Sequence, residues 1–327
     1  MVSAYQTQLK TLTINKLTYI AILVSAMIAI SGCSTGIEGT RRVTPNRDDR
    51  RLLQQTPEEI FISNVHADSL GRWKPGKRFL VTDNKAALIY EISDKNGMRL
   101  HDDSLAGQTI IFRDVADYTA PDGSTAIKIN FTHPATGKTV SYNTNRPAVK
   151  AASIDWNNLP MLVDLDLVES FRSLLTGKTL WIKTPLWYSD KGEPLTGTKF
   201  IPVEILDVMP GNAIFPLNVK FRSDDAVAFI PMNASDKSSS FVSRVFPSLF
   251  YLSDPKESYP AITPETWNLI CHGRLALGMT KTECKLAVGN PKEVEHGHNW
   301  DVLIDYWKYE NGMFLVFIDD KLTEFKQ

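Results

Sequence analysis

The sequence predicts a mainly β protein, with two small β-barrels in tandem followed by a C-terminal α+β domain of two layers. Short runs rich in β-branched and aromatic residues recur between residues 79 and 230, and glycines separate or flank them. The final part of the chain, from about residue 262, instead shows two helix starts and then three strand patterns. An apolar segment near the N-terminus belongs to none of these patterns.

The strand patterns fall into two blocks of similar size. The first contains the runs 79–82, 87–92, 109–115 and 126–131, and the second contains 179–184, 199–208, 215–221 and 226–230. Five or six short strands in about 60 to 70 residues suit an SH3-like barrel, whereas an immunoglobulin-like sandwich usually needs more. We therefore expect one SH3-like module in residues 59–150. Residues 151–250 should hold a linker helix, within 160–175, and a second such module.

The two blocks align as copies of one unit. The segment Gly76–Thr82 matches Gly177–Lys183, and the alternating pattern of Ile127, Ile129 and Phe131 recurs in Leu217, Val219 and Phe221. Gly107 and Asp117 also lie ninety residues before Gly197 and Asp207. The identity is low but the order is consistent, which predicts two related barrels rather than a solenoid.

The C-terminal segment, residues 255–327, has a clear order of elements. One helix begins at Thr263-Pro264, because threonine is a good N-cap and proline suits the first helical position. A capping box from Thr280 to Glu283 begins a second helix, which Gly289 ends. Strand patterns follow at 304–309, 313–319 and 322–325. The expected order is helix, helix, strand, strand, strand.

This segment resembles the BamE/SmpA-OmlA fold of small envelope lipoproteins. The resemblance rests on Gly278-Met279-Thr280-Lys281, Gly289-x-Pro291, Trp307-x-Tyr309 and Asp320-x-Leu322, and covers about 65 of 327 residues. It implies two helices packed on a three-stranded antiparallel sheet. It implies no role in outer-membrane assembly, because the assembly lipoproteins lack the roughly 200 residues that precede the domain here. The whole arrangement is similar to multidomain envelope lipoproteins of unknown role.

The N-terminus resembles a bacterial lipoprotein signal. Lys10 and Lys16, without any acidic residue, precede an apolar run from Leu17 to Ile30 that is shorter than the roughly 20 residues of a membrane-spanning helix. The run ends in Ile30-Ser31-Gly32-Cys33, which resembles the lipobox. The resemblance implies cleavage before Cys33, a diacylglycerol on its thiol, and an acyl chain such as palmitate on the new N-terminus. The alternatives are an uncleaved membrane anchor and an ordinary signal peptide with a chance cysteine.

We therefore expect residues 1–32 to be a signal peptide and residues 33–58 to be a flexible basic tether. The tether carries Arg41, Arg42, Arg47, Arg50 and Arg51. These arginines have a second interpretation as a patch attracted to anionic lipid headgroups. By the sorting rule of enterobacteria, Ser34 favours the outer membrane. The expected location is the cell membrane or outer membrane, with the protein lipid-anchored and facing the periplasm or the cell exterior.

Loss of Lys10 and Lys16 with the signal peptide changes the formal charge from −1 to −3. That balance does not suit a polyanion, so we expect no nucleic-acid partner. Once Cys33 is acylated, Cys271 and Cys284 form an even pair in an oxidising compartment, where we expect a disulfide that links the two C-terminal helices. Two buried free thiols are the alternative.

No enzyme motif stands out, so we expect no catalytic residue, metal or cofactor. A catalytic Cys271 next to His272 is a minor alternative, because adjacent helix residues point apart and no orienting carboxylate is evident. His296-Gly297-His298 lacks a third metal ligand nearby and is interpreted as a solvated loop. Asp164 and Asp166 are interpreted as exposed positions. The chain has no Gly-rich phosphate loop, nucleophile elbow or zinc-binding helix motif.

The candidate recognition surface is aromatic and lies in the second barrel. Trp181, Trp187 and Tyr188 fit this role because SH3-like barrels bind ligands through aromatic grooves; alternatively, Trp181 lies in the core and Trp187 covers the barrel end. The expected function is a non-enzymatic envelope lipoprotein that binds a protein partner or acts as a scaffold. Peptidoglycan binding through the barrels is the rival hypothesis, and an enzyme whose residues meet only in the fold is the third.

Replacing Cys33 by alanine should release or mislocalise the protein, because the thiol that accepts the lipid is removed. Fractionation of cells into soluble and membrane material, followed by immunoblotting, measures this. Cys271→Ala is the matched control and should stay in the membrane fraction. A Cys33→Ala protein that fractionates like the unmodified chain would contradict the lipid-anchor hypothesis.

Overall fold

The computed structural model describes residues 55–100, 105–144, 159–224, 226–234, 244–299 and 302–326. The predicted signal peptide, Cys33 and nearly all of the predicted tether lie outside these residues. From Gln55 onward the chain forms one unit. No helix within these described ranges is both long enough and apolar enough to cross a bilayer.

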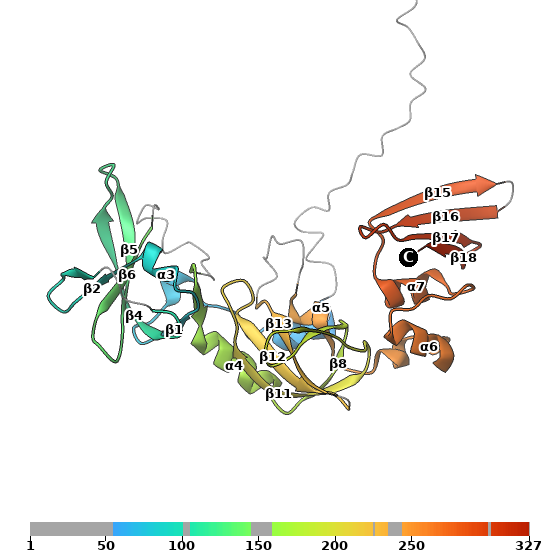
Figure 1. The fold of residues 1–327 in the computed structure, drawn as a ribbon, viewed down its shortest axis with the longest axis horizontal. Helices are drawn as coiled ribbons and strands as arrows, with labels where there is room; N and C mark the ends of the chain where they lie inside the picture. The colour runs from blue at the N-terminus through green and yellow to red at the C-terminus, as the bar shows by residue number, and fades with distance from the viewer. Residues whose placement is uncertain are drawn as a thin grey trace, which may run out of the picture. The chain divides into compact units, whose positions relative to one another are not determined.

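The described chain is mainly β, which confirms the predicted class at this level. Two seven-stranded sheets and one four-stranded sheet, all antiparallel, account for its strands (Figure 1). Each of the three sheets is associated with its own cluster of buried apolar side chains. We call the first two bodies module 1 and module 2, and the third the C-terminal domain.

Module 1 is built on seven strands in the order β3-β2-β6-β5-β4-β1-β7. They are β1 (Arg78–Val81), β2 (Tyr90–Ser93), β3 (Arg99–Leu100), β4 (Thr109–Thr119), β5 (Thr125–Thr132), β6 (Thr139–Asn143) and β7 (Leu162–Asp164). A 3₁₀ turn, η2 (Leu70–Arg72), and a short helix, α3 (Ala86–Ile89), accompany them. The core centres on Phe131, and Trp73 next to η2 covers Phe79 and Phe112 at ring distances of 4.8 and 5.4 Å.

Module 2 repeats this arrangement, with its strands in the order β10-β9-β13-β12-β11-β8-β14. They are β8 (Thr179–Ile182), β9 (Leu186–Tyr188), β10 (Pro194–Thr196), β11 (Pro202–Pro210), β12 (Leu217–Arg222), β13 (Val227–Met232) and β14 (Phe250–Tyr251). Each strand of module 2 occupies the place of the strand seven numbers lower in module 1. The internal repeat predicted from the sequence is therefore confirmed by the sheet order.

Backbone pairing fixes which residues of the two modules are equivalent. Gly76 donates to the carbonyl of Phe112, and Gly177 donates to the carbonyl of Ile205, at 2.9 and 2.8 Å. Phe131 lies opposite Phe112, as Phe221 lies opposite Ile205. The predicted matches of Gly76 with Gly177 and of Phe131 with Phe221 are thus correct. A β-bulge follows Phe112 and Ile205 in both copies.

Two of the predicted matches are wrong. Asp114, not Asp117, is the counterpart of Asp207, because each is the first paired residue after the bulge. Gly107, which donates to Val81, matches Phe200, which donates to Ile182, rather than Gly197. The offset between the copies is 93 residues at Phe112 and Ile205 but 90 at Phe131 and Phe221, because the β4–β5 hairpin is longer than the β11–β12 hairpin.

The predicted linker helix is α4 (Leu165–Leu175), and it belongs to the core of module 2. Its apolar face buries Leu167, Val168, Phe171 and Leu175 in that core. Asp164 is the N-cap, accepting hydrogen bonds from the backbone amides of Asp166 and Leu167, and it forms a buried ion pair with Lys77 at 2.7 Å. The prediction that Asp164 is exposed was therefore wrong, although Asp166 is half-exposed as a helix surface residue.

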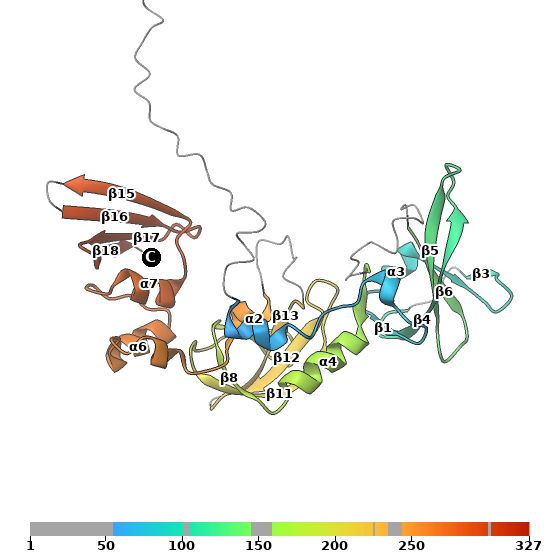
Figure 2. The ribbon, with the colours of Figure 1, turned by 180° about the vertical axis from the view of Figure 1, so that it is seen from behind.

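The first described helix, α2 (Pro57–Ile62), packs on module 2 rather than on module 1, which follows it in the sequence. Phe61 contacts Phe246 of α5 (Phe246–Leu249) at a ring distance of 5.4 Å. Figure 2 shows α2 at module 2, where Phe61 and Ile62 pack against the core. The helix includes the last two residues of the expected tether, because Thr56 and Glu59 form a capping box. The chain thus reaches module 2 first, forms module 1, and returns to module 2 through α4.

The C-terminal domain has two helices on one side of a four-stranded sheet (Figure 1). The elements are α6 (Pro264–Cys271), α7 (Lys281–Val288), β15 (Glu293–Asn299), β16 (Val302–Lys308), β17 (Phe314–Ile318) and β18 (Lys321–Lys326). Both helix starts are as predicted, with Thr263 as N-cap of α6 and the Thr280–Glu283 box opening α7.

Strand β15 was not predicted. It pairs with β16 along its whole length, so His296 and Gly297 lie in a strand rather than in the expected loop. The sequence Glu293–Asn299 is polar and poor in β-branched residues, and pairing with β16 rather than local propensity makes it a strand. The expected three-stranded sheet is therefore a four-stranded one.

Candidate functional site

The predicted aromatic surface of module 2 is not assembled. Trp187 is only 5% exposed, stands edge-on to Phe221 at 5.2 Å, and donates from Nε1 to the carbonyl of Thr184 at 2.8 Å. Its ring also fills the space above Gly197, where a Cβ atom would lie 2.1 Å from it. Trp187 is thus a core residue, and the hypothesis that it belongs to a recognition surface was wrong.

Trp181 and Tyr188 remain half-buried, but on different strands. Trp181 alternates with buried Leu180 and Ile182 on β8, so its side chain faces away from the core of module 2. Strand β9, which carries Tyr188, is separated from β8 in the sheet order by β13, β12 and β11. The sheet does not make Trp181 and Tyr188 neighbours.

Cys271 and Cys284 are free, buried thiols in the structure, rather than the expected disulfide. The two thiols have different electrostatic neighbours. Cys271 is affected by Lys199 and Lys256, on the side of α6 that faces module 2, whereas Cys284 interacts with Tyr309. The arrangement agrees with the alternative of two buried thiols. Burial raises the pKa of both thiols, that of Cys284 to about 12, and so disfavours their reactive thiolate forms.

The structural joint between module 2 and the C-terminal domain is formed by Lys199 and Phe200, which lie between β10 and β11. The backbone amide of Lys199 donates to the carbonyl of Cys271 at 3.0 Å. Its Nζ donates to the carbonyls of Leu286 and Ala287 at 2.7 and 2.5 Å. These carbonyls belong to the last turn of α7, where no intrahelical donor is left for them and a cation complements the helix dipole.

Phe200 completes this joint from a strained backbone. Its φ of +58° lies in the left-handed region, where the equivalent Gly107 of module 1 has a φ of +76°. A non-glycine residue in that region costs about 1–3 kcal/mol. The ring of Phe200 is buried in the core of the C-terminal domain, edge-on to Trp267 at 5.9 Å and 6.1 Å from Tyr251. Burial of the ring offsets the strain.

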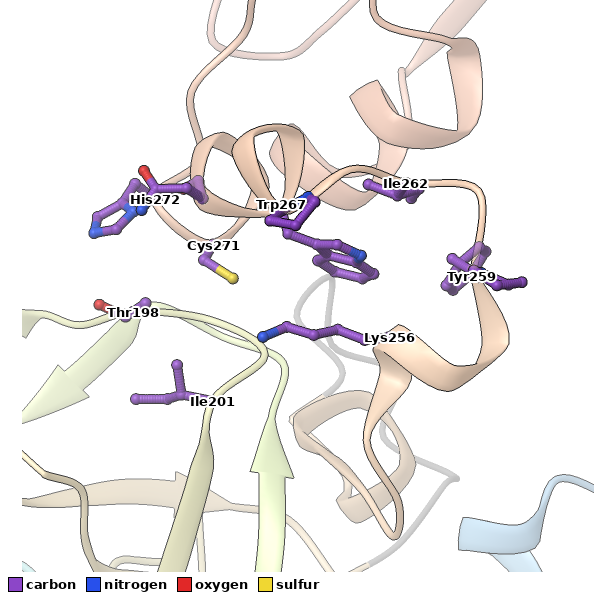
Figure 3. Close-up of a pocket in the computed structure, with 11 residues that line it drawn as sticks. Thr198, Ile201, Lys256, Tyr259, Ile262, Trp267, Cys271 and His272 are labelled. Atoms are coloured by element: carbon purple, nitrogen blue, oxygen red, sulfur yellow. Dashed lines mark hydrogen bonds between the residues drawn. The ribbon is translucent and has the colours of Figure 1, made fainter.

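A cavity of about 530 Å³ lies beside this joint, between module 2 and α6 (Figure 3). Module 2 supplies Thr198 and Ile201, and the 3₁₀ turn η4 (Pro255–Ser258) supplies Lys256. The remaining lining residues come from the segment after η4 and from α6: Tyr259, Pro260, Ile262, Pro264, Trp267, Asn268, Cys271 and His272.

The polar groups of the cavity do not form a catalytic pair. His272 is turned away from Cys271, and its Nδ1 lies 2.8 Å from the carbonyl oxygen of Asn268 (Figure 3). The thiol of Cys271 instead points toward the space that Lys256 enters. The cavity therefore offers the amine of Lys256 and the protonated thiol of Cys271 beside apolar walls, and its other polar side chains are Thr198, Asn268 and His272. This lining suits binding rather than nucleophilic attack.

A second polar cluster holds α7 to the sheet. Lys281 pairs with Asp305 of β16 and with Asp320 of the β17–β18 turn, and His296 Nδ1 lies 2.6 Å from Asp305 Oδ1. Burial alone would raise the pKa of Asp305, but the hydrogen bonds from Lys281 and His296 lower it below its ordinary value. Within the part of the chain that the structure describes, no group of three or more His, Cys, Asp or Glu side chains could hold a metal ion.

The side of the C-terminal sheet opposite the helices is apolar at its centre. We call this apolar surface the outer face, and it consists of Ile304, Tyr306, Phe314, Val316 and Ile318. None of these five belongs to the three core clusters, although Val316 is only 8% exposed. Tyr306 and Phe314 stack at 6.1 Å, and charged residues border the patch: Glu295, Lys308, Lys321, Glu324 and Lys326.

Comparison with known proteins found no matching family model, no matching curated protein and no matching solved structure.

Replacing Phe200 by alanine should destabilise the joint by about 3–5 kcal/mol, the usual cost of removing a buried phenyl ring. The backbone strain stays, because alanine also carries a Cβ atom. Urea unfolding followed by tryptophan fluorescence measures the loss. Leu186→Ala, at an exposed position of module 2, is the control and should change the unfolding free energy little. Equal effects of the two substitutions would contradict the assigned role of Phe200.

Lys199 should make stability depend on pH. Burial lowers the pKa of its amine from 10.5 to about 8. Between these values the unfolded chain holds a proton that the native chain has lost, so stability rises with pH in this window, by up to about 1.4 kcal/mol per pH unit. Lys199→Met should remove this rise, although it lowers stability overall by leaving the carbonyls of Leu286 and Ala287 unpaired.

The measurement is urea unfolding at several pH values from 7 to 10.5 for both proteins. The difference in slope between them isolates Lys199, because all other titrating groups are shared. Parallel pH profiles would show that the amine does not titrate in this window.

Proposed function

We propose that this protein is a non-enzymatic envelope lipoprotein, anchored through Cys33, that binds a protein partner through the outer face of its C-terminal sheet. The lipobox-like sequence Ile30–Cys33 supports the anchor. The outer face supports the binding role, and it is the observation that carries the proposal.

The chemistry of this face resembles that of protein interfaces. Ile304 pairs across the sheet with Ile318, and Tyr306 pairs with Val316, so the apolar side chains form a continuous patch over β16 and β17. Ile318 is 37% exposed, and Val316 at the centre of the patch is 8% exposed. The other three side chains are half-buried. An apolar centre with aromatic side chains and a charged rim is the usual anatomy of a protein-binding surface.

The edge of the sheet next to this patch is also available for contact. Among the described strands, β15 pairs only with β16. It carries no proline or lysine, two residues that commonly protect an edge strand from further pairing. An extended segment of the partner would add along β15 and place its side chains against the outer face.

We also propose that the two modules are SH3-like barrels and that the C-terminal domain is BamE-like. The order β6-β5-β4-β1-β7 supports the first proposal, because a meander of three strands followed by the first and last strands is the order of a five-stranded SH3-like barrel. The β2–β3 hairpin then occupies the long loop between the first two barrel strands. The second proposal rests on two capped helices packed on an antiparallel sheet, with β15 as an addition.

Ile318→Glu should weaken partner binding at least tenfold, because an unpaired carboxylate in an apolar interface costs more than about 1.4 kcal/mol. Val227→Glu is the matched control, since Val227 is another exposed β-branched residue on a strand, at 46% exposure. The measurement is crosslinking in native membranes followed by quantitative mass spectrometry. A crosslinked partner should be retained with Val227→Glu and lost with Ile318→Glu.

Identical crosslinks for the original chain and both variants would contradict binding through the outer face. Sedimentation with purified cell-wall sacculi distinguishes protein binding from the rival hypothesis of peptidoglycan binding. If the protein sediments with sacculi and Ile318→Glu does not reduce this, peptidoglycan rather than a protein is the partner.

A further inference from the structure

The cavity at the joint is held open by structure on both sides. Ile201 lies next to Phe200 in the chain, and Trp267 packs against the ring of Phe200. The hydrogen bonds of Lys199 to Cys271, Leu286 and Ala287 fix α6 and α7 against module 2. The walls are therefore preorganised, and the volume of about 530 Å³ lies within the range of small-molecule sites.

The walls of the cavity are largely apolar. Trp267 and Tyr259 stand in edge-on contact at 6.3 Å, and Ile201 faces them from module 2 (Figure 3). Flat aromatic and aliphatic walls of this kind favour a ligand with an apolar, preferably aromatic, body. Cys271 adds a soft contact, since its thiol stays protonated and uncharged below its raised pKa.

In the described part of the chain, the cavity is lined by a cationic side chain and by no carboxylate. The amine of Lys256 points toward Thr198 and Cys271 (Figure 3). None of the described residues that line the cavity is acidic. The nearby carboxylate of Asp254 accepts a hydrogen bond from the backbone amide of Lys256 at 2.9 Å and is not part of the lining. The side chain of Lys256 is exposed to solvent, and its amine borders the apolar walls, where it attracts an anionic group.

We propose that this cavity binds a small organic anion. The apolar body of the ligand lies between Trp267 and Ile201, and its carboxylate, sulfonate or phosphate group pairs with the amine of Lys256. The thiol of Cys271 borders the site and forms no covalent bond with this ligand. The site is separate from the outer face of the C-terminal sheet, so this proposal does not depend on partner binding.

Labelling of Cys271 tests the charge preference in the full chain, in native membranes. An anionic reagent, 2-sulfonatoethyl methanethiosulfonate, is compared with the cationic 2-(trimethylammonium)ethyl methanethiosulfonate. Each rate is divided by the rate of that reagent with free β-mercaptoethanol, and Cys271 is followed by peptide mass spectrometry. The anionic reagent should react several-fold faster at Cys271, and Lys256→Gln should remove this preference. Lys95→Gln, at an exposed position of module 1, should keep it.

Protection by a ligand probe tests binding itself. Increasing 2-naphthalenesulfonate should slow the labelling of Cys271 to a plateau in the original chain, and the uncharged 2-naphthol should protect much less. Cys284, which is fully buried, reports the integrity of each variant, because it becomes reactive only if the C-terminal domain opens.

The proposal is overturned by equal normalised rates of the two reagents in the original chain. It is also overturned if 2-naphthol protects as well as 2-naphthalenesulfonate, or if Lys95→Gln changes the preference as much as Lys256→Gln. The Ile318→Glu variant separates the two proposals. It should lose the crosslinked partner while 2-naphthalenesulfonate still protects its Cys271 from labelling.

Discussion

The contact of Lys199 and Phe200 with α6 and α7 is the interaction on which the arrangement of the second half of the chain depends. The amine of Lys199 pairs with carbonyls at the C-terminal end of α7, and the ring of Phe200 enters the core of the C-terminal domain beside Trp267. The left-handed backbone at Phe200 turns its ring out of module 2. Strain in one module is thus compensated by packing in another, and the cavity beside α6 is a consequence of that contact.

The two modules show how a repeated unit acquires different neighbours. At the position where module 2 has Phe200, module 1 has Gly107, which adopts the same left-handed turn without a side chain to insert. A few residues further on, Val208 is fully buried, whereas its counterpart Val115 is 41% exposed. Helix α4 precedes β8 and packs along β11 in module 2, whereas only the short turn η2 precedes β1, the equivalent of β8, in module 1. The two modules therefore share one strand order but expose different residues at equivalent positions.

Local signals in the sequence were enough to predict much of the fold. The caps at Thr263 and Thr280, the alternating strands and the repeat all depend on neighbouring residues, and all are present in the structure. Strand β15 and the inward position of Trp187 depend on partners distant in sequence, so local propensity could not reveal them. The cavity was missed for the same reason. One signal was available: with the correct offset of 93 residues, an aromatic residue stands at a turn that uses glycine in the other copy.

The docking of α2 on module 2 decides how mechanical tension travels through the chain. A pull at residue 55 is first resisted by α2, whose Phe61 packs against Phe246, although the covalent route from α2 leads into module 1. As long as α2 holds, the load bypasses module 1 and passes directly into module 2. It then reaches the C-terminal domain through the covalent segment after β14, supported by the contacts of Lys199 and Phe200. Module 1 then lies outside the path of the load. It would bear tension only after α2 detached from module 2.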